Sequence, residues 1–314
     1  MRRDRLFVIG IIAIALMFAL VTIGSKYLWR SKSTTYITVT SPPHPPKQKP
    51  FTFPAGGRTL LPDYRFVALY GTPGMPVLGA LGEQPPSDAI ARIKDIATSY
   101  QPYSSEPIYP TFEMITTIAS ASPTDNGDYS QEVPAATLQP WIDAARQAGV
   151  YVVLDLQPGR TDFLTQAEEY ADLLQQPNVG LALDPEWRLG PTQVPLVQIG
   201  SVDVSEINAT ADWLATLTRQ NKLPQKLFVL HQFRLSMITN RGALNTTHPE
   251  LANIIQMDGN GTQPTKLDTW NTIHQQLPPH VYMGWKNFYK VDSPMLAPGQ
   301  TMQLTPQPWY VSYQ

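Results

Sequence analysis

The sequence predicts an α/β fold, a TIM-type (β/α)8 barrel whose last strand is not followed by a helix, preceded by one N-terminal transmembrane helix. Three observations support the barrel. Apolar runs rich in β-forming residues alternate with segments of helical periodicity, there are eight such runs, and residues 58–314 have the length of a single barrel domain. An open, doubly wound parallel sheet is the alternative fold.

The N-terminus has the pattern of a membrane anchor. A basic tip, residues 1–5, is followed by an apolar run from Leu6 to Gly24 that contains neither charge nor proline. A run of about 20 apolar residues is long enough to cross a bilayer core, and the arginines of the tip favour a cytoplasmic N-terminus. We therefore expect a signal-anchor in residues 6–24 and a single-pass cell-membrane protein with an extracytoplasmic C-terminal domain. A cleaved signal peptide is the alternative.

Residues 25–57 are expected to form an extended extracytoplasmic linker, because the run from Ser41 to Pro50 contains five prolines. The barrel domain is expected over residues 58–314. The chain has no cysteine, which excludes disulfides, thiolate chemistry and a lipid attached through a cysteine. The net charge is −2 with 15% charged residues, so we expect no nucleic-acid partner.

Eight segments are predicted as parallel strands from their apolar, β-rich composition. They are Arg65 to Tyr70, Tyr109 to Ile115, Val150 to Asp155, Val179 to Asp184, Lys226 to His231, Ala252 to Asp258, Val281 to Lys286 and Trp309 to Tyr313. Helical stripes between them include Ile90, Ile93 and Ala97; Trp141, Ala144, Ala145 and Ala148; and Ile207, Ala211, Leu214 and Leu217. A capping-box pattern at Thr265-Lys266-Leu267-Asp268 predicts the start of a further helix. Only a short helix fits after the fifth strand.

Polar side chains end most of these strands, and in a barrel of this class the strand ends carry the functional site. The candidates are Glu113, Asp155, Gln157, Asp184, Glu186, Trp187, His231, Gln232, Asp258, Trp285 and Lys286. Alternation along a strand predicts that Asp155 and Gln157, Asp184 and Glu186, and Gln256 and Asp258 each share one face. The two acids of the Asp184-x-Glu186 pair are then expected about 7 Å apart.

Clustered acids of this kind suit the cleavage of glycosidic bonds. One carboxyl group donates a proton to the leaving oxygen, and a second remains ionised to stabilise the positive transition state. We expect Glu186 as the general acid, with Asp184 or Asp155 as its ionised partner, and like charges that raise at least one pKa in this group. The remaining candidates are expected to bind substrate, with Trp187 and Trp285 as platforms for sugar rings. This function needs no metal or other cofactor.

Three strings carry a resemblance: Asp184-Pro185-Glu186-Trp187-Arg188, Gln198-Ile199-Gly200-Ser201 and the run from Leu227 to Phe233. With them the region from about Tyr64 to Gln314 resembles exported actinobacterial proteins generally labelled as hypothetical proteins or lipoproteins, a family without an established activity. More loosely, Asp184-x-Glu186 is similar to TIM-barrel glycoside hydrolases of the chitinase and muramidase types. That resemblance implies a general acid at Glu186. The chain has Gly180 and Ala182 where the chitinase type carries further acids.

The preferred function is therefore a membrane-anchored surface glycoside hydrolase that acts on cell-envelope polysaccharide. One alternative is a non-catalytic protein that binds carbohydrate or organises the envelope on a degenerate barrel. Another is a metal-dependent hydrolase of the phosphodiesterase type that uses Glu113, Asp155 and Asp258, because an all-oxygen site suits a hard cation.

Overall fold

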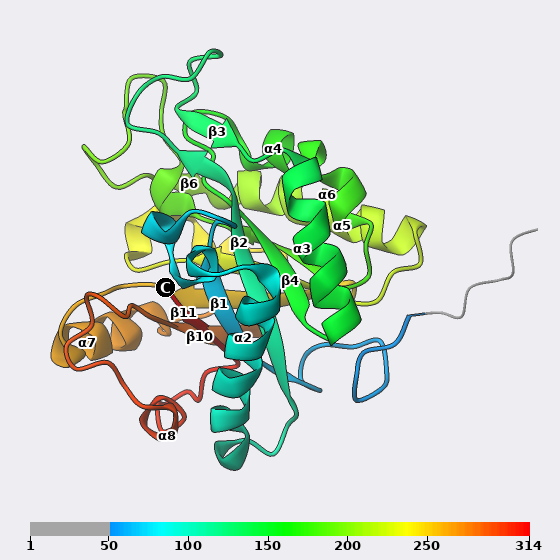
Figure 1. Ribbon diagram of the computed structural model, residues 1–314. Helices are drawn as coiled ribbons and strands as arrows, with labels where there is room; N and C mark the ends of the chain where they lie inside the picture. Colours follow the sequence, from blue (N-terminus) through cyan, green and yellow to red (C-terminus); the bar gives the residue numbers. More distant parts are fainter. Residues whose placement is uncertain (1–50) are drawn as a thin grey trace, which may run out of the picture. The chain divides into compact units, whose positions relative to one another are not determined.

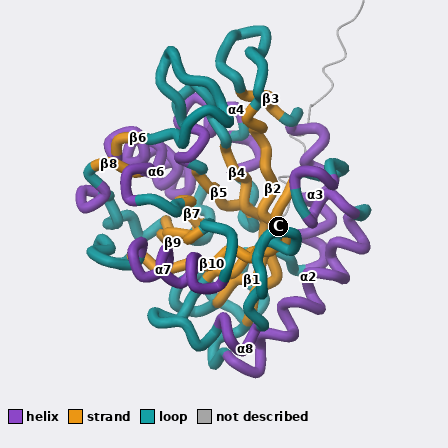
Figure 2. Tube along the Cα trace, turned by 90° about the vertical axis from the view of Figure 1, so that its left-hand side faces the viewer, coloured by secondary structure: helices purple, strands orange, loops and turns teal. Residues whose placement is uncertain are grey.

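A computed structural model describes residues 51–314, which form a closed barrel of eight parallel strands. The ring is closed at β1, which pairs with both β11 and β2. Figure 2 shows this ring with the helices outside it. The barrel strands in chain order are β1 (Arg65–Gly71), β2 (Ile108–Ala119), β4 (Tyr151–Leu156), β5 (Val179–Leu183), β7 (Lys226–His231), β9 (Leu251–Met257), β10 (Val281–Asn287) and β11 (Tyr310–Tyr313). The predicted barrel is thus confirmed, and the open sheet is excluded.

The predicted strands differ from the observed ones mainly at two ends. β2 continues to Ala119 because its last residues pair antiparallel with a short additional strand, β3 (Ser130–Glu132). β5 ends at Leu183, one residue before the predicted end at Asp184, because a proline follows at position 185. Two further short strands, β6 (Val202–Asp203) and β8 (Ile238–Thr239), pair with each other outside the barrel.

The helices pack around the barrel and bury one face against it (Figure 1). They are α2 (Pro86–Tyr100), α3 (Ala135–Ala148), α4 (Phe163–Glu169), α5 (Ala171–Leu174), α6 (Val204–Gln220), α7 (Gln263–Ile273) and α8 (Pro298–Thr301). The predicted stripes are confirmed on α2, α3 and α6, where members such as Ile93, Ala145 and Leu214 are fully buried. The predicted capping box was wrong, since α7 begins at Gln263 with Thr262 as its N-cap. Within residues 51–314, no helix follows β11 (Tyr310–Tyr313).

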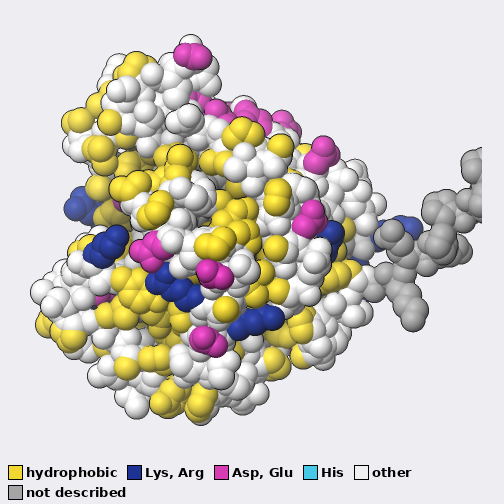
Figure 3. Space-filling view, in the orientation of Figure 1, with side chains coloured by type: hydrophobic (Ala, Val, Ile, Leu, Met, Phe, Trp, Pro, Cys, Tyr) yellow, Lys and Arg dark blue, Asp and Glu magenta, His cyan; other side chains and the backbone are white. Residues whose placement is uncertain are grey.

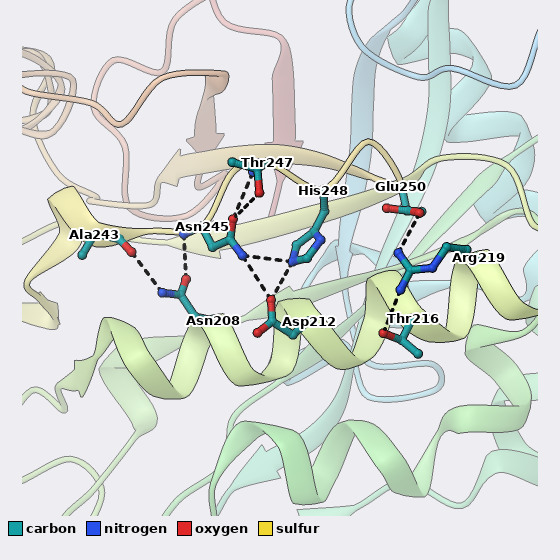
Figure 4. A network of polar contacts seen from close by, with 9 residues as sticks. All are labelled: Asn208, Asp212, Thr216, Arg219, Ala243, Asn245, Thr247, His248 and Glu250. Atoms are coloured by element: carbon teal, nitrogen blue, oxygen red, sulfur yellow. Dashed lines mark hydrogen bonds and ion pairs between the residues drawn. The ribbon is translucent and has the colours of Figure 1, made fainter.

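The connection from β7 to β9 contains two short 3-10 turns and the two-residue strand β8 in place of a full helix, and it is fastened to α6 by side-chain contacts (Figure 4). The Asn208 amide donates to the carbonyl oxygen of Ala243 at 3.0 Å, and its oxygen accepts from the backbone N–H of Asn245 at 2.8 Å. Farther along the same helix, Asp212 contacts His248 at 2.6 Å. These contacts hold the connection in the place that a helix takes in the other repeats.

The barrel interior is closed at its amino end by aromatic side chains. Phe53, Tyr64, Phe66, Tyr109 and Tyr151 form one buried cluster with ring centroids 5.4 to 6.3 Å apart. Phe53 belongs to the segment predicted as linker, yet only 2% of its surface is exposed. The predicted boundary at residue 58 was therefore too late, since burying a phenylalanine contributes about 1.5–3 kcal/mol to folding.

Within residues 51–314, no helix combines the length and the apolar character that a membrane span requires. The basic tip, the predicted anchor in residues 6–24 and most of the predicted linker lie outside the described residues.

Candidate functional site

Acidic side chains from several strands meet at the carboxyl end of the barrel, which we call the mouth. The nearest carboxylate oxygens of Asp184, Glu186 and Asp258 lie within 4.8 Å of one another. A second group, formed by Asp155, Asp184 and His231, is equally close. Since β4, β5 and β7 are neighbours in the barrel, their ends bring these residues together, as the sequence predicted.

The turn that carries Glu186 differs from the prediction. The residues Pro185–Trp187 form one 3-10 turn directly after β5, so Asp184 and Glu186 do not continue a strand face. The turn brings the two carboxyl groups closer than the 7 Å expected for strand geometry. It is fixed from the other side, where the backbone N–H of Gly200 donates to the carbonyl oxygen of Glu186 at 2.6 Å.

Below this acid group, a buried chain of three side chains crosses the barrel. His231 Nε2 lies 2.8 Å from Glu113 Oε1, and His231 Nδ1 lies 3.2 Å from Asp258 Oδ2. Burial lowers the pKa of His231, but the carboxylates of Asp155 and Glu113 outweigh it and raise the pKa well above its usual range. The ring is therefore an imidazolium that donates a hydrogen bond from each nitrogen.

Tyr70 joins the site from β1, and the sequence analysis missed it. Its hydroxyl donates to Asp155 Oδ2 at 2.7 Å, and Lys286 Nζ lies 3.4 Å from the centroid of its ring. The strand register places Tyr70 beside Glu113, so it is another polar side chain near a strand end. A search that included tyrosine among the polar strand-end residues would have found it.

Burial is the main cause of the raised pKa values in this cluster. It raises the pKa of Glu186 to about 7, with the charge of Asp258 as the next contribution. Burial also raises the pKa of Asp184 well above its usual range, and the charge of Glu186 is the second contribution there. Burial is likewise the main cause of the raised pKa of Asp155. The prediction that at least one pKa is raised is confirmed in direction, but like charges are the second cause and not the first.

A cavity of about 550 Å³ opens above the acids. Six of the predicted candidates line it: Gln157, Asp184, Glu186, Trp187, Asp258 and Lys286. Residues that the sequence analysis missed complete the lining, and they include Tyr70, Ile199, Phe233, Arg234, Asn260, Thr269, Phe288 and Gln314. Most of these come from loops, whose position no periodic pattern reports.

Four of the predicted substrate-binding residues do not line this cavity. Glu113 and His231 are fully buried beneath it. The side chain of Trp285 packs between barrel and helices, against Trp270 at 5.6 Å, because Lys286 takes the inward direction and neighbouring strand residues alternate. Its predicted role as a sugar platform was wrong.

Gln232, the fourth of these residues, accepts a hydrogen bond from Arg241 at 2.8 Å. Its amide nitrogen donates to the carbonyl oxygen of Arg234 at 3.1 Å. Both contacts are with the connection that follows β7. Gln232 therefore positions this connection, and its predicted contact with substrate was wrong.

The acid cluster also has the composition of a site for a hard cation. Among the described residues, one oxygen each of Asp155, Asp184 and Asp258 is buried without a hydrogen-bond partner. Carboxylate oxygens are the ligands that Mg²⁺, Ca²⁺ and Mn²⁺ prefer. The carboxyl groups of the cluster can thus either donate and accept protons or coordinate a cation.

No protein-family model and no curated protein sequence matches this chain.

Proposed function

We propose that this protein is a glycoside hydrolase that acts on cell-envelope polysaccharide. The observation that carries the proposal is the group of three acids, Asp184, Glu186 and Asp258, with oxygens within 4.8 Å of one another beside an open cavity at the mouth of a parallel barrel. Such a group contains both forms of carboxyl that glycosidic cleavage needs, a proton donor and an ionised partner.

Glu186 has the properties of the proton donor. Its side chain borders the cavity, and a pKa of about 7 leaves a large fraction protonated near neutral pH. A general acid is most effective when its pKa lies near the working pH. Lys286, which borders the same cavity, lies close enough to favour the ionised form once the proton has been delivered.

Asp258 fits the role of the ionised partner better than Asp184, which the sequence analysis preferred together with Asp155. Asp258 faces the imidazolium of His231, which stabilises its negative charge. Asp184 is buried beside Glu186, and its raised pKa favours the neutral form. Asp155, which accepts a hydrogen bond from Tyr70, is placed to support the site from beneath.

The spacing of the acids supports a mechanism with retention of configuration. An inverting enzyme holds its two carboxyl groups roughly 6.5–9.5 Å apart to admit a water molecule between them and the sugar. The oxygens of Glu186 and Asp258 are closer than this. In the proposed reaction Glu186 protonates the leaving oxygen while Asp258 forms a bond to the sugar. Water then breaks that bond, with Glu186 accepting its proton.

The decisive experiment compares wild-type protein with Glu186→Gln on purified envelope polysaccharide, with new reducing ends as the readout. The amide retains the shape of the side chain but donates no comparable acidic proton, so we expect the rate to fall by about 10²- to 10⁴-fold. Glu168→Gln, at an exposed position on α4, is the matched control. Equal rates for wild type and Glu186→Gln would refute the role of Glu186. Binding without cleavage by either protein would favour the carbohydrate-binding alternative.

A metal-dependent hydrolase is the second candidate, favoured by the unpartnered buried oxygens of the acid cluster. The residues predicted for it require revision, because Glu113 is engaged by His231 and lies beneath the cavity. Asp184, Glu186 and Asp258 form the corresponding set. A rise in the thermal unfolding midpoint with added Mg²⁺, Ca²⁺ or Mn²⁺, absent in Asp258→Asn, together with activity that EDTA abolishes, would support this candidate over the first.

The location of the protein is also a proposal. The apolar run from Leu6 to Gly24, with arginines before it, supports a single-pass anchor in the cell membrane and a barrel on its outer side. Such a location would give the barrel access to envelope polysaccharide.

A further inference from the structure

The cavity beside Glu186 continues in two directions. It shares Trp187 and Arg234 with a second cavity of about 650 Å³. It shares Phe288 and Gln314 with a third cavity of about 200 Å³. The second and third cavities have no lining residue in common, so the cavity with the acids lies between them.

The two outer cavities lie on opposite sides of the barrel. The second is lined by the loops that follow β5 and β7, and the third by the loops that follow β1 and β10. In the strand order, β1 stands across the ring from β5 and β7. The three cavities therefore form one cleft that crosses the mouth.

Both walls of this cleft are fixed by close backbone packing. On one side, a Cβ atom added to Gly200 would lie 2.5 Å from the carbonyl oxygen of Glu186. On the other, a Cβ atom added to Gly79 would lie 2.5 Å from the carbonyl oxygen of Tyr70, and its φ of +144° disfavours any other residue. The loops that line the outer cavities are thus attached closely to the strand ends that carry the site.

The exposed hydrophobic side chains gather along this cleft. Within residues 51–314, nine large hydrophobic residues are exposed, and only Tyr103 lies outside the loops of the mouth. The other eight are Met75, Val77, Leu196, Val197, Ile199, Leu235, Tyr289 and Val291. Figure 3 shows hydrophobic side chains spread over the face of the molecule in this view, including its left-hand part, where Figure 1 places β6 and α7. A patch of this kind marks a binding surface.

The outer cavities carry few charges. Besides Glu186, the second cavity is lined by one charged side chain, Arg234. The third has one of each sign, Glu83 and Lys290. A polyanionic chain requires a row of cations along its path, and neither cavity has one. The charge pattern therefore favours a ligand that is uncharged along most of its length.

We infer that the cleft binds an extended, uncharged polysaccharide chain on both sides of Glu186, so that the enzyme cleaves the chain at internal bonds and not from an end. This inference rests on the proposed function. An enzyme that removes terminal sugars needs a site closed beyond the terminal unit, whereas this cleft continues past the acids in both directions. Sugar units in the outer cavities would pack their apolar faces against the hydrophobic side chains there.

The test measures how the chain length of the polysaccharide changes during the reaction and how the rate depends on that length. Full-length protein is incubated with long, soluble envelope polysaccharide, and reducing ends are measured together with molecular mass by size-exclusion chromatography. Internal cleavage lowers the mean mass steeply after few cuts. We also expect Val77→Asp and Leu196→Asp to lower the ratio of the rates on long and short chains about tenfold, because each removes apolar contact from one outer cavity. Tyr103→Asp, exposed but outside the mouth, is the matched control.

The outcomes separate this inference from the proposed function. Release of single terminal sugars with little change in mean mass would overturn internal cleavage while leaving the glycoside hydrolase in place. If no bond is cleaved, the proposed function fails. The affinity of the protein for polysaccharide fragments of increasing length then shows whether the cleft binds an extended chain. Affinity that rises with length and falls in both variants supports the extended binding site, and affinity independent of length overturns it.

Discussion

The raised pKa of Glu186 makes a prediction about stability that does not depend on knowing the substrate. Its pKa is about 7 in the folded protein, against a usual value of 4.5. Below pH 4.5 the group is neutral in both the folded and the unfolded chain. Between pH 4.5 and 7 the unfolded chain loses this proton and the folded protein retains it, so stability falls as pH rises. Above pH 7 the loss amounts to about 3 kcal/mol.

Glu186→Gln should remove this pH-dependent loss. The glutamine has no charge at any of these pH values, so the free energy of unfolding of the variant relative to wild type should rise by about 3 kcal/mol between pH 4.5 and 8. A second effect acts in the same direction. After burial, Glu186 is the largest contribution that raises the pKa of Asp184, so removing its charge also lowers the cost of ionising Asp184.

Urea unfolding at a series of pH values measures this difference, with Glu168→Gln as the exposed control. The comparison between variants cancels the pH dependence of every group that does not interact with Glu186. The cost of burying an amide shifts the whole curve and leaves its slope unchanged. Parallel curves for wild type and Glu186→Gln from pH 4.5 to 8 would refute the reasoning and, with it, the assignment of Glu186 as a carboxyl kept protonated near neutral pH.

Four further predictions follow from the same geometry. His231→Leu removes a buried imidazolium between two carboxyl groups and should lower the free energy of unfolding by about 3–5 kcal/mol in urea titrations at pH 6; since the pKa of His231 is raised on folding, its stabilisation is present below the usual value of 6.5 and decreases as pH rises toward the folded pKa, and unchanged stability at pH 6 would contradict the ion pairs. Gly200→Ala should lower the rate on polysaccharide with little change in circular dichroism, because the new methyl group displaces the turn of Glu186; full activity would contradict this. The first product seen by NMR should retain the anomeric configuration, and inversion would exclude the proposed covalent step. Full-length protein should stay with membranes in high salt while a chain beginning at Phe51 stays in the supernatant, and a mature N-terminus after residue 24 would exclude the anchor.

The barrel could be predicted from sequence because its signal is repeated and local. Eight apolar runs, each of strand length, are separated by helical stripes such as Ile207, Ala211 and Leu214. Period-two alternation also placed Asp155 correctly, since Val153 and Asp155 both face the barrel interior. In each case the face of a residue follows from its neighbours along the chain, so the pattern was sufficient.

The same alternation was applied wrongly in one place and left unused in another. Pro185 ends the strand after Leu183, so Glu186 lies on a turn and not on the strand face of Asp184. Trp285 and Lys286 are consecutive in β10 and point in opposite directions, so only one of them can reach the cavity. Both errors had a local signal, a proline in the first case and the strand period in the second.

The other missed residues had no local signal. Arg234, Phe288 and Gln314 reach the cavity from three loops or chain ends that are distant in sequence. They are held by contacts between segments distant in sequence: Ser201 Oγ donates to the carbonyl oxygen of Ser236 at 2.7 Å in the loop of Arg234, and the N–H of Tyr289 donates to the carbonyl oxygen of Gln314 at 2.9 Å. Sequence spacing does not report how such loops are held, and the extended cleft was therefore visible only in the structure.

The charge balance of the mouth is the strongest physical argument that it performs a function. Five carboxyl groups, those of Glu113, Asp155, Asp184, Glu186 and Asp258, surround two cations, His231 and Lys286. Burying acids in excess of their counterions is unfavourable, and a barrel selected for stability alone would replace them with apolar residues. The amino end of the same barrel does so, with an aromatic cluster around Phe53 and Tyr109. One end of the barrel is thus filled with apolar side chains and the other with acids that repel one another. Because the acids make the mouth the less stable end, we infer that they are retained for their chemistry. A group of carboxyl groups with too few cations is suited to hold and release a proton beside Glu186.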